Sequence, residues 1–307
     1  MTPSNRVVII GAGNVGSSIA YSLLSQEIAQ EILILDIANE LVNAQVLDMQ
    51  DSANFTHGIK IEVGDYKDLI DGDIVVITCG VAQKEGETRI DLLKTNAGII
   101  RNVVKSIKDT TRNVYLLMVT NPVDILTYIA VKESGLPEAQ VFGSGTFLDT
   151  ARLRVALSKE TGVSSSSIHA YVMGEHGDTS FPVLSNASVS GISLGKFINN
   201  DAKFYKDIQL NVKDKAYQII KGKKATYYGI GSAIARICKI ILHDEKRIVP
   251  LSVVLNGEYG YKDISIGVPV LLSKKGVEFV GEIDLDQTEK EMMKKSTDEI
   301  RSYLDNI

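Results

Sequence analysis

Four short segments of the chain hold residues that can move protons and bind anions. They read V-A-Q-K-E-G-E-T-R over 81–89, T-N-P-V-D-I-L over 120–126, L-D-T-A-R-L-R over 148–154 and G-E-H-G-D over 174–178. An imidazole such as that of His176 titrates near the working pH and can give or take a proton. A guanidinium group such as that of Arg152 can bind a carboxylate through two parallel hydrogen bonds. The four segments therefore suit acid–base chemistry on a small anionic substrate.

The spacing within 148–154 sends its polar side chains in two directions. On a helix, Asp149 and Arg152 are about 300° apart, so they project within about 60° of each other and can reach one site. Arg154 lies about 200° round from Arg152 and faces elsewhere. Each residue has a structural alternative, since Asp149 can be a helix cap and His176 an exposed loop histidine. We therefore give weight to the combination and not to any one residue.

A glycine-rich loop near the N-terminus predicts a dinucleotide site. The loop consists of Gly11, Ala12, Gly13, Asn14, Val15 and Gly16, and it follows an apolar run and opens a helical stretch. Gly11 permits a tight turn, Gly13 lets the backbone approach a pyrophosphate, and Gly16 lets the helix pack on the strand. Asp36, twenty residues after Gly16, can accept hydrogen bonds from a ribose diol, which favours NAD over NADP. The alternative is a glycine turn that binds nothing, with Asp36 as a helix cap.

The first half of the chain alternates short apolar runs with helical stretches such as 15–25 and 89–108. The runs predict strands at Arg6–Ile10, Glu31–Leu35, Ile59–Val63, Asp73–Thr78, Asn113–Val119 and Gln140–Phe142. Nearly continuous apolar runs are typical of strands buried on both faces of a parallel sheet. This alternation predicts an α/β fold with a doubly wound parallel sheet, the Rossmann arrangement.

The second half predicts a separate α+β substrate domain. We expect helices at 149–161, 201–220, 226–242 and 288–306, with Gly222 between the second and the third. Strands are expected at 168–173, 251–255, 264–273 and 277–280, the last two joined by a hairpin turn at Lys275–Gly276. We place the boundary near Gly143–Gly145, which gives domains of residues 1–143 and 144–307.

Composition limits the function further. The 307 residues carry 33 Lys and Arg against 38 Asp and Glu, a net charge of −5 that argues against a general nucleic-acid binder. Cys79 and Cys238 have no partners at metal-ligand spacing, so neither a zinc site nor any other metal site is expected. The chain has neither a signal-peptide pattern nor an apolar run long enough to span a membrane, which makes the cytoplasm the expected compartment.

The glycine loop and the four segments, in this order, resemble the lactate/malate dehydrogenase family over essentially the whole chain. The resemblance implies an NAD-dependent enzyme that reduces a 2-oxo acid. It makes His176 the proton donor, Asp149 the carboxylate that orients the imidazole, and Arg152 the group that binds the substrate carboxylate. It also makes Arg89 the group that polarises the substrate carbonyl as negative charge develops.

The resemblance assigns three further positions. Asn121 would hold the substrate oxygen and contact the cofactor, and Thr226 would lie beside the nicotinamide and the substrate. Residues 81–91 look like the mobile lid of the family, whose malate branch carries an arginine where this chain has Gln83. A second substrate carboxylate without a cation would be buried unpaired, so Gln83 favours pyruvate and L-lactate over oxaloacetate.

A regulatory site is the last expectation. Arg154 and His169 resemble the positions that bind fructose 1,6-bisphosphate in allosteric bacterial members of the family, and a homotetramer is the family's assembly. The first strand begins near Arg6 and leaves no room for the long N-terminal arm of the animal enzymes. The structural alternative is an ordinary interface arginine and a core histidine.

Two rival functions stay open at this point. One is a malate dehydrogenase, or another 2-hydroxy acid dehydrogenase, with the same fold. The other is a catalytically silent NAD-binding or structural protein built on this scaffold. The joint presence of His176, Asp149, Arg152 and Arg89 argues against silence, because a structural role would not require all four.

Overall fold

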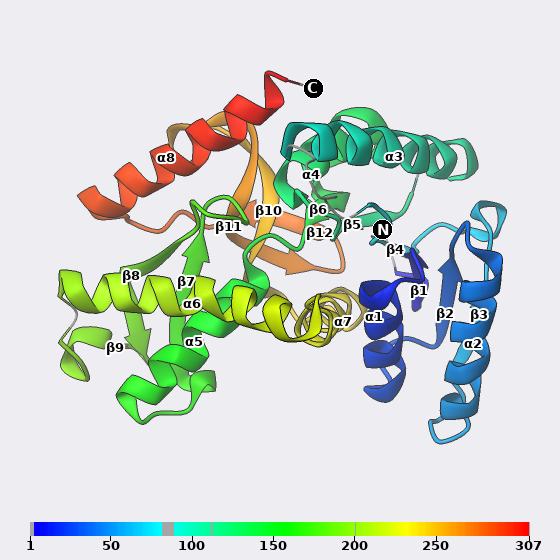
Figure 1. Ribbon diagram of the computed structural model, residues 1–307, viewed down its shortest axis with the longest axis horizontal. Helices are drawn as coiled ribbons and strands as arrows, with labels where there is room; N and C mark the ends of the chain where they lie inside the picture. Colours follow the sequence, from blue (N-terminus) through cyan, green and yellow to red (C-terminus); the bar gives the residue numbers. More distant parts are fainter. Residues whose placement is uncertain (1–2, 82–88, 112, 200, 307) are drawn as a thin grey trace.

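The computed structural model describes residues 3–81, 89–111, 113–199 and 201–306, apart from the side chain of Arg89. Its centre is a nine-stranded sheet with the order β12-β11-β10-β6-β5-β4-β1-β2-β3 (Figure 1). The strands are β1 (Arg6–Ile10), β2 (Glu31–Leu35), β3 (Lys60–Val63), β4 (Ile74–Ile77), β5 (Tyr115–Met118), β6 (Val141–Gly143), β10 (Arg247–Asn256), β11 (Lys262–Ser273) and β12 (Gly276–Val280).

A second, three-stranded sheet and the α-helices complete the fold. The small sheet has the order β7-β8-β9, with β7 (Ile168–Met173), β8 (Phe181–Val189) and β9 (Ile192–Ser193). The helices are α1 (Asn14–Ser25), α2 (Asn39–Ala53), α3 (Arg89–Thr110), α4 (Val123–Ser134), α5 (Phe147–Thr161), α6 (Ala202–Lys223), α7 (Tyr228–Leu242) and α8 (Gln287–Leu304). Among the described residues, none of these helices combines the length and apolar character needed to cross a bilayer.

The predicted doubly wound sheet is confirmed. The strands β1 to β6 pair in parallel in the order 3-2-1-4-5-6, and β1, β4 and β5 are buried along their whole length. Burial on both faces explains why these runs carry so few polar residues. The strand order reverses between β1 and β4, and in such sheets ligands bind in the crevice at the carboxyl ends of the strands on either side of this point.

The second half of the chain contributes strands to this same sheet. Its strands β10, β11 and β12 form an antiparallel extension of the sheet, and Ser252 on β10 pairs with Gly143 on β6. A Cβ atom at Gly143 would lie 2.4 Å from Thr127 Oγ1 and 3.0 Å from Ser252 Cβ, so this junction requires glycine. The predicted boundary at residue 143 coincides with the end of β6, although the sheet continues across it, and the domain limits stay a prediction.

One local expectation was wrong, and one long strand was missed. Gly222 does not separate two helices, because α6 continues through it to Lys223 and ends at Lys224, which has a φ of 72°. The sequence also gave no sign of β8, because Pro182, Ser185 and Asn186 interrupt its apolar pattern. The β11–β12 hairpin is present, but its turn is formed by Lys274 and Lys275, one residue before the predicted Lys275–Gly276, and Ser273 pairs with Gly276.

The last helix is fastened to the small sheet by a buried carboxylate. Glu289 on α8 accepts hydrogen bonds from the backbone N–H groups of Leu184 and Ser185, at 2.9 and 3.0 Å, and from the hydroxyl of Ser185 at 2.6 Å. It also forms a capping box with Asp286 at the start of α8. These contacts fix α8 relative to β8 and thereby to the loop that follows β7.

Candidate active site

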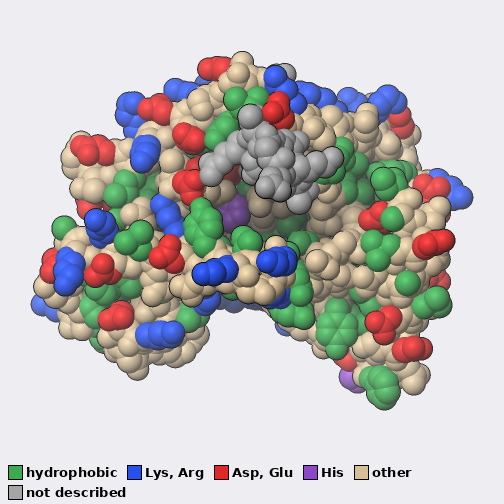
Figure 2. Space-filling model, in the orientation of Figure 1, with side chains coloured by type: hydrophobic (Ala, Val, Ile, Leu, Met, Phe, Trp, Pro, Cys, Tyr) green, Lys and Arg blue, Asp and Glu red, His purple; other side chains and the backbone are tan. Residues whose placement is uncertain are grey.

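A cavity of about 250 Å³ lies where the two halves of the chain meet. Its walls come from the starts of α3 and α4, the loops after β5 and β7, and helices α6 and α8. The lining residues are Leu92, Leu93, Asn121, Pro122, Asp124, Ile125, Glu175, His176, Gly177, Asp178, Tyr217, Ile300 and Tyr303. The space-filling view shows this face hollowed, with a histidine side chain inside the hollow (Figure 2). The cavity thus holds the imidazole that the sequence singled out.

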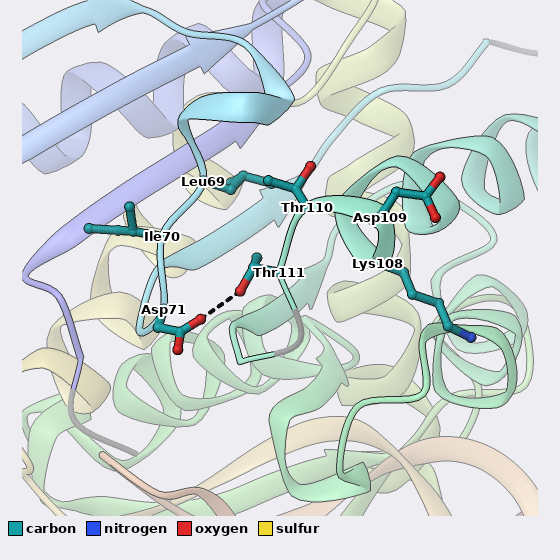
Figure 3. Close-up of a pocket in the computed structure, with 7 residues that line it drawn as sticks. All are labelled: Leu69, Ile70, Asp71, Lys108, Asp109, Thr110 and Thr111. Atoms are coloured by element: carbon teal, nitrogen blue, oxygen red, sulfur yellow. Dashed lines mark hydrogen bonds between the residues drawn. The ribbon is translucent and has the colours of Figure 1, made fainter.

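A larger surface cavity, of about 530 Å³, lies elsewhere (Figure 3). Its wall is formed by 69–71, just before β4, and by 108–111 at the end of α3, and Thr111 Oγ1 donates to Asp71 Oδ1 at 2.7 Å. These segments lie at the amino ends of the parallel strands. Ligand sites of such sheets lie at the carboxyl ends, so we assign the chemistry to the smaller cavity with His176.

His176, Asp149 and Arg152 form a connected group, of which His176 lines this cavity. Arg152 is among the residues that line a separate surface cavity of about 500 Å³ between α5 and α6. Asp149 Oδ2 lies 2.7 Å from His176 Nδ1, and Asp149 Oδ1 accepts from Arg152 Nη1 at 2.8 Å. Asp149 is buried, and the side chain of His176 is 28% exposed. With Nδ1 held by the carboxylate, Nε2 is the ring nitrogen that can act on a ligand. The predicted helical proximity of Asp149 and Arg152 is confirmed.

The surroundings of His176 favour its protonated form. Burial by itself lowers the pKa of His176, but the charge and hydrogen bond of Asp149 outweigh it and raise the pKa to about 9. Burial raises the pKa of Asp149, yet the nearby His176 and Arg152 together hold it below its usual value. The pair is therefore charged at neutral pH, with the proton on the imidazole.

The loop that carries His176 is held on several sides. Asp124 on α4 accepts from the backbone N–H of His176 at 2.7 Å, and Ser296 on α8 accepts from the N–H of Glu175 at 2.8 Å. From α6, Lys213 donates to the carbonyl of Asp178. These contacts fix the backbone on which the imidazole depends.

Sequence reasoning missed the residues that hold this loop. Asp124 stands in the quoted segment 120–126, and its signal was a carboxylate in the first turn of an otherwise apolar helix. Ser296 gave no signal, because it is one polar residue of an amphipathic helix.

Asn121 is brought to the same cavity, at the carboxyl end of β5. Its carbonyl accepts from Asn96 Nδ2 at 3.0 Å, and Asn96 Oδ1 accepts from the backbone N–H of Val81 at 2.9 Å. Asn96 on α3, which the sequence analysis also missed, thus ties Asn121 to the point where residues 81–91 begin.

The remaining predicted substrate residues are not placed against the cavity. Gln83 lies outside the described residues. Arg89 is the first residue of α3, and its side chain is likewise outside the description. Thr226 is half-buried in the connection between α6 and α7 and is not among the residues that line the cavity. Their roles stay predictions.

The glycine loop has the geometry that a dinucleotide requires. Gly11 has a φ of +116°, and a Cβ atom at Gly16 would lie 1.8 Å from the carbonyl oxygen of Gly11. A Cβ atom at Gly13 would meet nothing within 4 Å, so the space in front of this backbone is open. Helix α1, whose first residues are Asn14 and Val15, has no side-chain cap and no acidic residue in its first turn. Its free N–H groups can therefore receive a phosphate.

Asp36 completes this fit at the end of β2. Its carboxylate accepts from the N–H of Ala12 at 2.6 Å and from the N–H of Ala38 at 2.8 Å. The carboxylate thus lies beside the glycine loop, where it would meet a ribose diol and repel a 2′-phosphate. These residues fit NAD. Among the described residues, no cluster of His, Cys, Asp or Glu could hold a metal ion.

Arg154 and His169 lie away from this cavity, as the helix geometry predicted for Arg154. Arg154 Nε donates to the carbonyl of Ala170 at 3.1 Å, and its guanidinium carbon lies 5.3 Å from the centre of the Tyr171 ring. Burial lowers the pKa of Arg154, and the charge of Arg247 lowers it further. His169 on β7 is exposed, not a core histidine. Arg247, the other cation near Arg154, also lies 3.6 Å from a carboxylate oxygen of Glu245.

Comparisons with known proteins agree with this geometry. Residues 5–143 match the NAD-binding domain of the lactate/malate dehydrogenase family, and residues 146–307 match its α/β C-terminal domain. The sequence is 44% identical to the L-lactate dehydrogenase of Lacticaseibacillus casei over 303 residues, which are 97% of this chain and 93% of that protein. It is also 44% identical to the L-lactate dehydrogenase of Lactobacillus helveticus, over 98% of this chain and 94% of that protein.

Solved structures give the same result. A lactate dehydrogenase from a Medee basin deep-sea metagenome library superposes with a TM-score of 0.96 at 44% identity, covering 100% of this chain and 99% of the other. The minor L-lactate dehydrogenase of Enterococcus mundtii, in a ligand-bound form, gives a TM-score of 0.95 at 38% identity and covers 100% of this chain and 98% of the other.

Proposed function

The chain belongs to the lactate/malate dehydrogenase family and is an NAD-dependent L-lactate dehydrogenase, and on that premise we propose that His176 is its proton donor and acceptor. The observation that carries this proposal is the contact of 2.7 Å between His176 Nδ1 and the buried Asp149. It leaves Nε2 facing the ligand and keeps the imidazole charged at neutral pH. A charged imidazole is the state that can protonate a new alkoxide.

The other side chains of the site position the substrate. Bound NADH supplies the hydride. Arg152 donates one N–H to Asp149, and its other N–H groups can bind the substrate carboxylate. Asn121 lies at the cavity and can hold the carbonyl oxygen. Arg89, at the start of α3, would polarise that oxygen, a role that rests on the family resemblance.

The preference for pyruvate over oxaloacetate rests on Gln83, a residue known here from the sequence alone. The test is the initial rate of NADH oxidation with each substrate. We expect kcat/KM for pyruvate to be at least about a hundredfold higher, because an unpaired buried carboxylate costs several kcal/mol. The substitution Gln83→Arg should move the preference toward oxaloacetate. Comparable values in the unaltered protein would instead support a malate dehydrogenase.

We further propose that Arg154 and His169 bind the phosphates of fructose 1,6-bisphosphate. What supports this is the exposed imidazole of His169 on the strand that Arg154 contacts, together with the nearby charge of Arg247. The bisphosphate should lower the apparent KM for pyruvate. It should lose this effect when Arg154 or His169 is replaced by alanine, and an unchanged KM at millimolar effector would contradict the site.

A homotetramer in the cytoplasm completes the proposal. Its support is a group of exposed apolar side chains on and just after α2: Leu41 and Leu47 on the helix, and Phe55, 88% exposed, two residues beyond its end. Exposed apolar side chains gathered on one segment mark an interaction surface. For the compartment, the support is that Cys79 and Cys238 are both unpaired thiols, as in a reducing environment.

A further inference from the structure

A second buried carboxylate lies behind the catalytic histidine. Asp124, in the first turn of α4, is 3% exposed and lines the same cavity as His176. Its Oδ2 accepts from the backbone N–H of His176 at 2.7 Å. Its Oδ1 accepts from the hydroxyl of Ser252 at 2.6 Å, and Ser252 Oγ lies 2.9 Å from Ser265 Oγ. Both carboxylate oxygens are therefore occupied by donors.

The surroundings of Asp124 require a side chain that can accept two hydrogen bonds, one on each oxygen. Ser252 on β10 and Ser265 on β11 are fully buried hydroxyls inside an otherwise apolar sheet. A buried hydroxyl is unfavourable unless it is hydrogen-bonded, and Ser252 satisfies this need by donating to Asp124. The antiparallel extension of the sheet thus supports the carboxylate, and the carboxylate supports the loop of His176.

We propose that Asp124 is a second positioning residue for His176, one that holds the backbone of the loop and stabilises the charged form of the imidazole. The inference rests on the proposed role of His176 as proton donor. Asp149 fixes the ring from Nδ1, whereas Asp124 acts on the backbone N–H and through its charge. Positive charge on the imidazole is then balanced by two carboxylates, on α5 and on α4.

Among the described residues, few other charged groups face His176 and Asp124. His176 faces Asp149 and Arg152 on α5 and Asp124 on α4, and Asp124 faces Glu175 in the loop after β7. From β10, Ser252 donates to the carboxylate of Asp124, and from β11, Ser265 contacts Ser252.

These surroundings set the titration of Asp124. Burial raises its pKa to about 6, with the hydrogen bonds from Ser252 and His176 acting in the opposite direction. Asp124 is therefore ionised at neutral pH, when the imidazole is charged.

The substitution Asp124→Asn separates charge from position, because asparagine keeps the shape and one acceptor oxygen for the N–H of His176. Two readouts are needed: the NMR titration of the His176 ring, assigned by its absence in His176→Gln, and the pH profile of kcat/KM for pyruvate. We expect the pKa of His176 to fall by about one unit in both. The alkaline limit of pyruvate reduction should therefore move to lower pH.

The matched control is Ser252→Ala, which removes a hydrogen bond to the same carboxylate but leaves its charge and its contact with His176. The titration of His176 should stay within a few tenths of a unit of the unaltered protein. An unmoved titration in Asp124→Asn, with the rate lowered evenly at all pH values, would reduce Asp124 to a structural anchor and overturn the proposal.

A shifted ring titration without a shifted pH profile has a different meaning. It would support the effect of Asp124 on the imidazole and contradict His176 as the proton donor. If Asp124→Asn does not fold, the unaltered protein still decides, because the His176 ring signal should show a second inflection near the pKa of Asp124, about 6. A titration curve of the His176 ring with no inflection near pH 6 would overturn the proposal.

Discussion

At the scale of single residues, the site is defined by charges that are buried together. His176, Asp149 and Arg152 occur within 28 positions of the chain, and their hydrogen bonds of 2.7 and 2.8 Å join them into one group. Helix geometry predicted that Asp149 and Arg152 lie together, and the resemblance to the family added His176 to them. The sequence could not predict Asp124, because nothing in it indicates that α4 passes beneath the loop of His176.

The raised pKa of His176 leads to a prediction about pH. Reduction of pyruvate requires the protonated imidazole, so its kcat/KM should be level through neutral pH and fall about tenfold per unit above about pH 9. Oxidation of lactate requires the neutral imidazole, so its kcat/KM should rise with pH until about 9. Initial rates in both directions should be measured between pH 6 and pH 10.5, a range that covers the fall of pyruvate reduction and the rise of lactate oxidation. A limit near the ordinary histidine pKa of about 6.5 would contradict the role of Asp149.

Arg152 leads to a second prediction. Lysine keeps the charge but has no planar fork, so Arg152→Lys should lose the paired hydrogen bonds to the substrate carboxylate and also the contact with Asp149. We expect kcat/KM for pyruvate to fall by about 10- to 150-fold, mostly through KM, because a hydrogen bond to a charged group contributes about 1.5–3 kcal/mol. The control is NADH affinity, measured by fluorescence, which should not change. A KM equal to that of the unaltered protein would show that Arg152 does not bind the carboxylate.

At the scale of elements, the site depends on where helices and strands begin and end. The glycine loop turns β1 into α1 without a side-chain cap, and Asp36 ends β2 beside that turn. These junctions were predictable, because each has a local chemical signature in the sequence. The attachment of α8 through Glu289, and the addition of β10–β12 to the sheet, were not predictable, since they depend on pairing between distant segments.

Two glycines of the loop give a matched pair of substitutions. Gly16→Ala places a Cβ atom 1.8 Å from the carbonyl of Gly11 and should displace α1, lowering the free energy of unfolding by about 1–3 kcal/mol. Gly13→Ala places its Cβ atom in open space in front of the loop, so it should leave stability nearly unchanged and weaken NADH binding. Thermal unfolding and an NADH titration measure both. Equal NADH affinity in Gly13→Ala and the unaltered protein would contradict the placement of the pyrophosphate.

At the scale of the whole molecule, one half of the chain brings the cofactor loop and the other brings His176, Asp149 and Arg152. The cavity between them also takes wall residues from α3 and α8, which are far apart in the sequence. Fold class, cofactor and reaction could be predicted because the motifs follow each other in the family's order. The continuous nine-stranded sheet could not, because no local pattern tells which edge β10 joins.

The exposed apolar side chains on and just after α2 lead to a prediction about assembly. If Leu47 and Phe55 lie in a subunit interface, replacing both with charged residues should reduce the molar mass measured by light scattering below that of the tetramer. The control is the same double exchange at Tyr21 and Val63, which are also exposed but lie outside this segment. An unaltered protein that is monomeric at micromolar concentration would contradict the tetramer itself.

The central claim is that His176 delivers the proton to the reduced substrate, and the most direct measurement is single-turnover NADH oxidation with pyruvate by His176→Gln. Glutamine can hydrogen-bond but does not titrate, so NADH binding should persist while the rate of the chemical step falls by about 10²- to 10⁴-fold and loses its alkaline limit. A rate within about tenfold of the unaltered protein, or an alkaline limit that stays near pH 9, would show that another group supplies the proton.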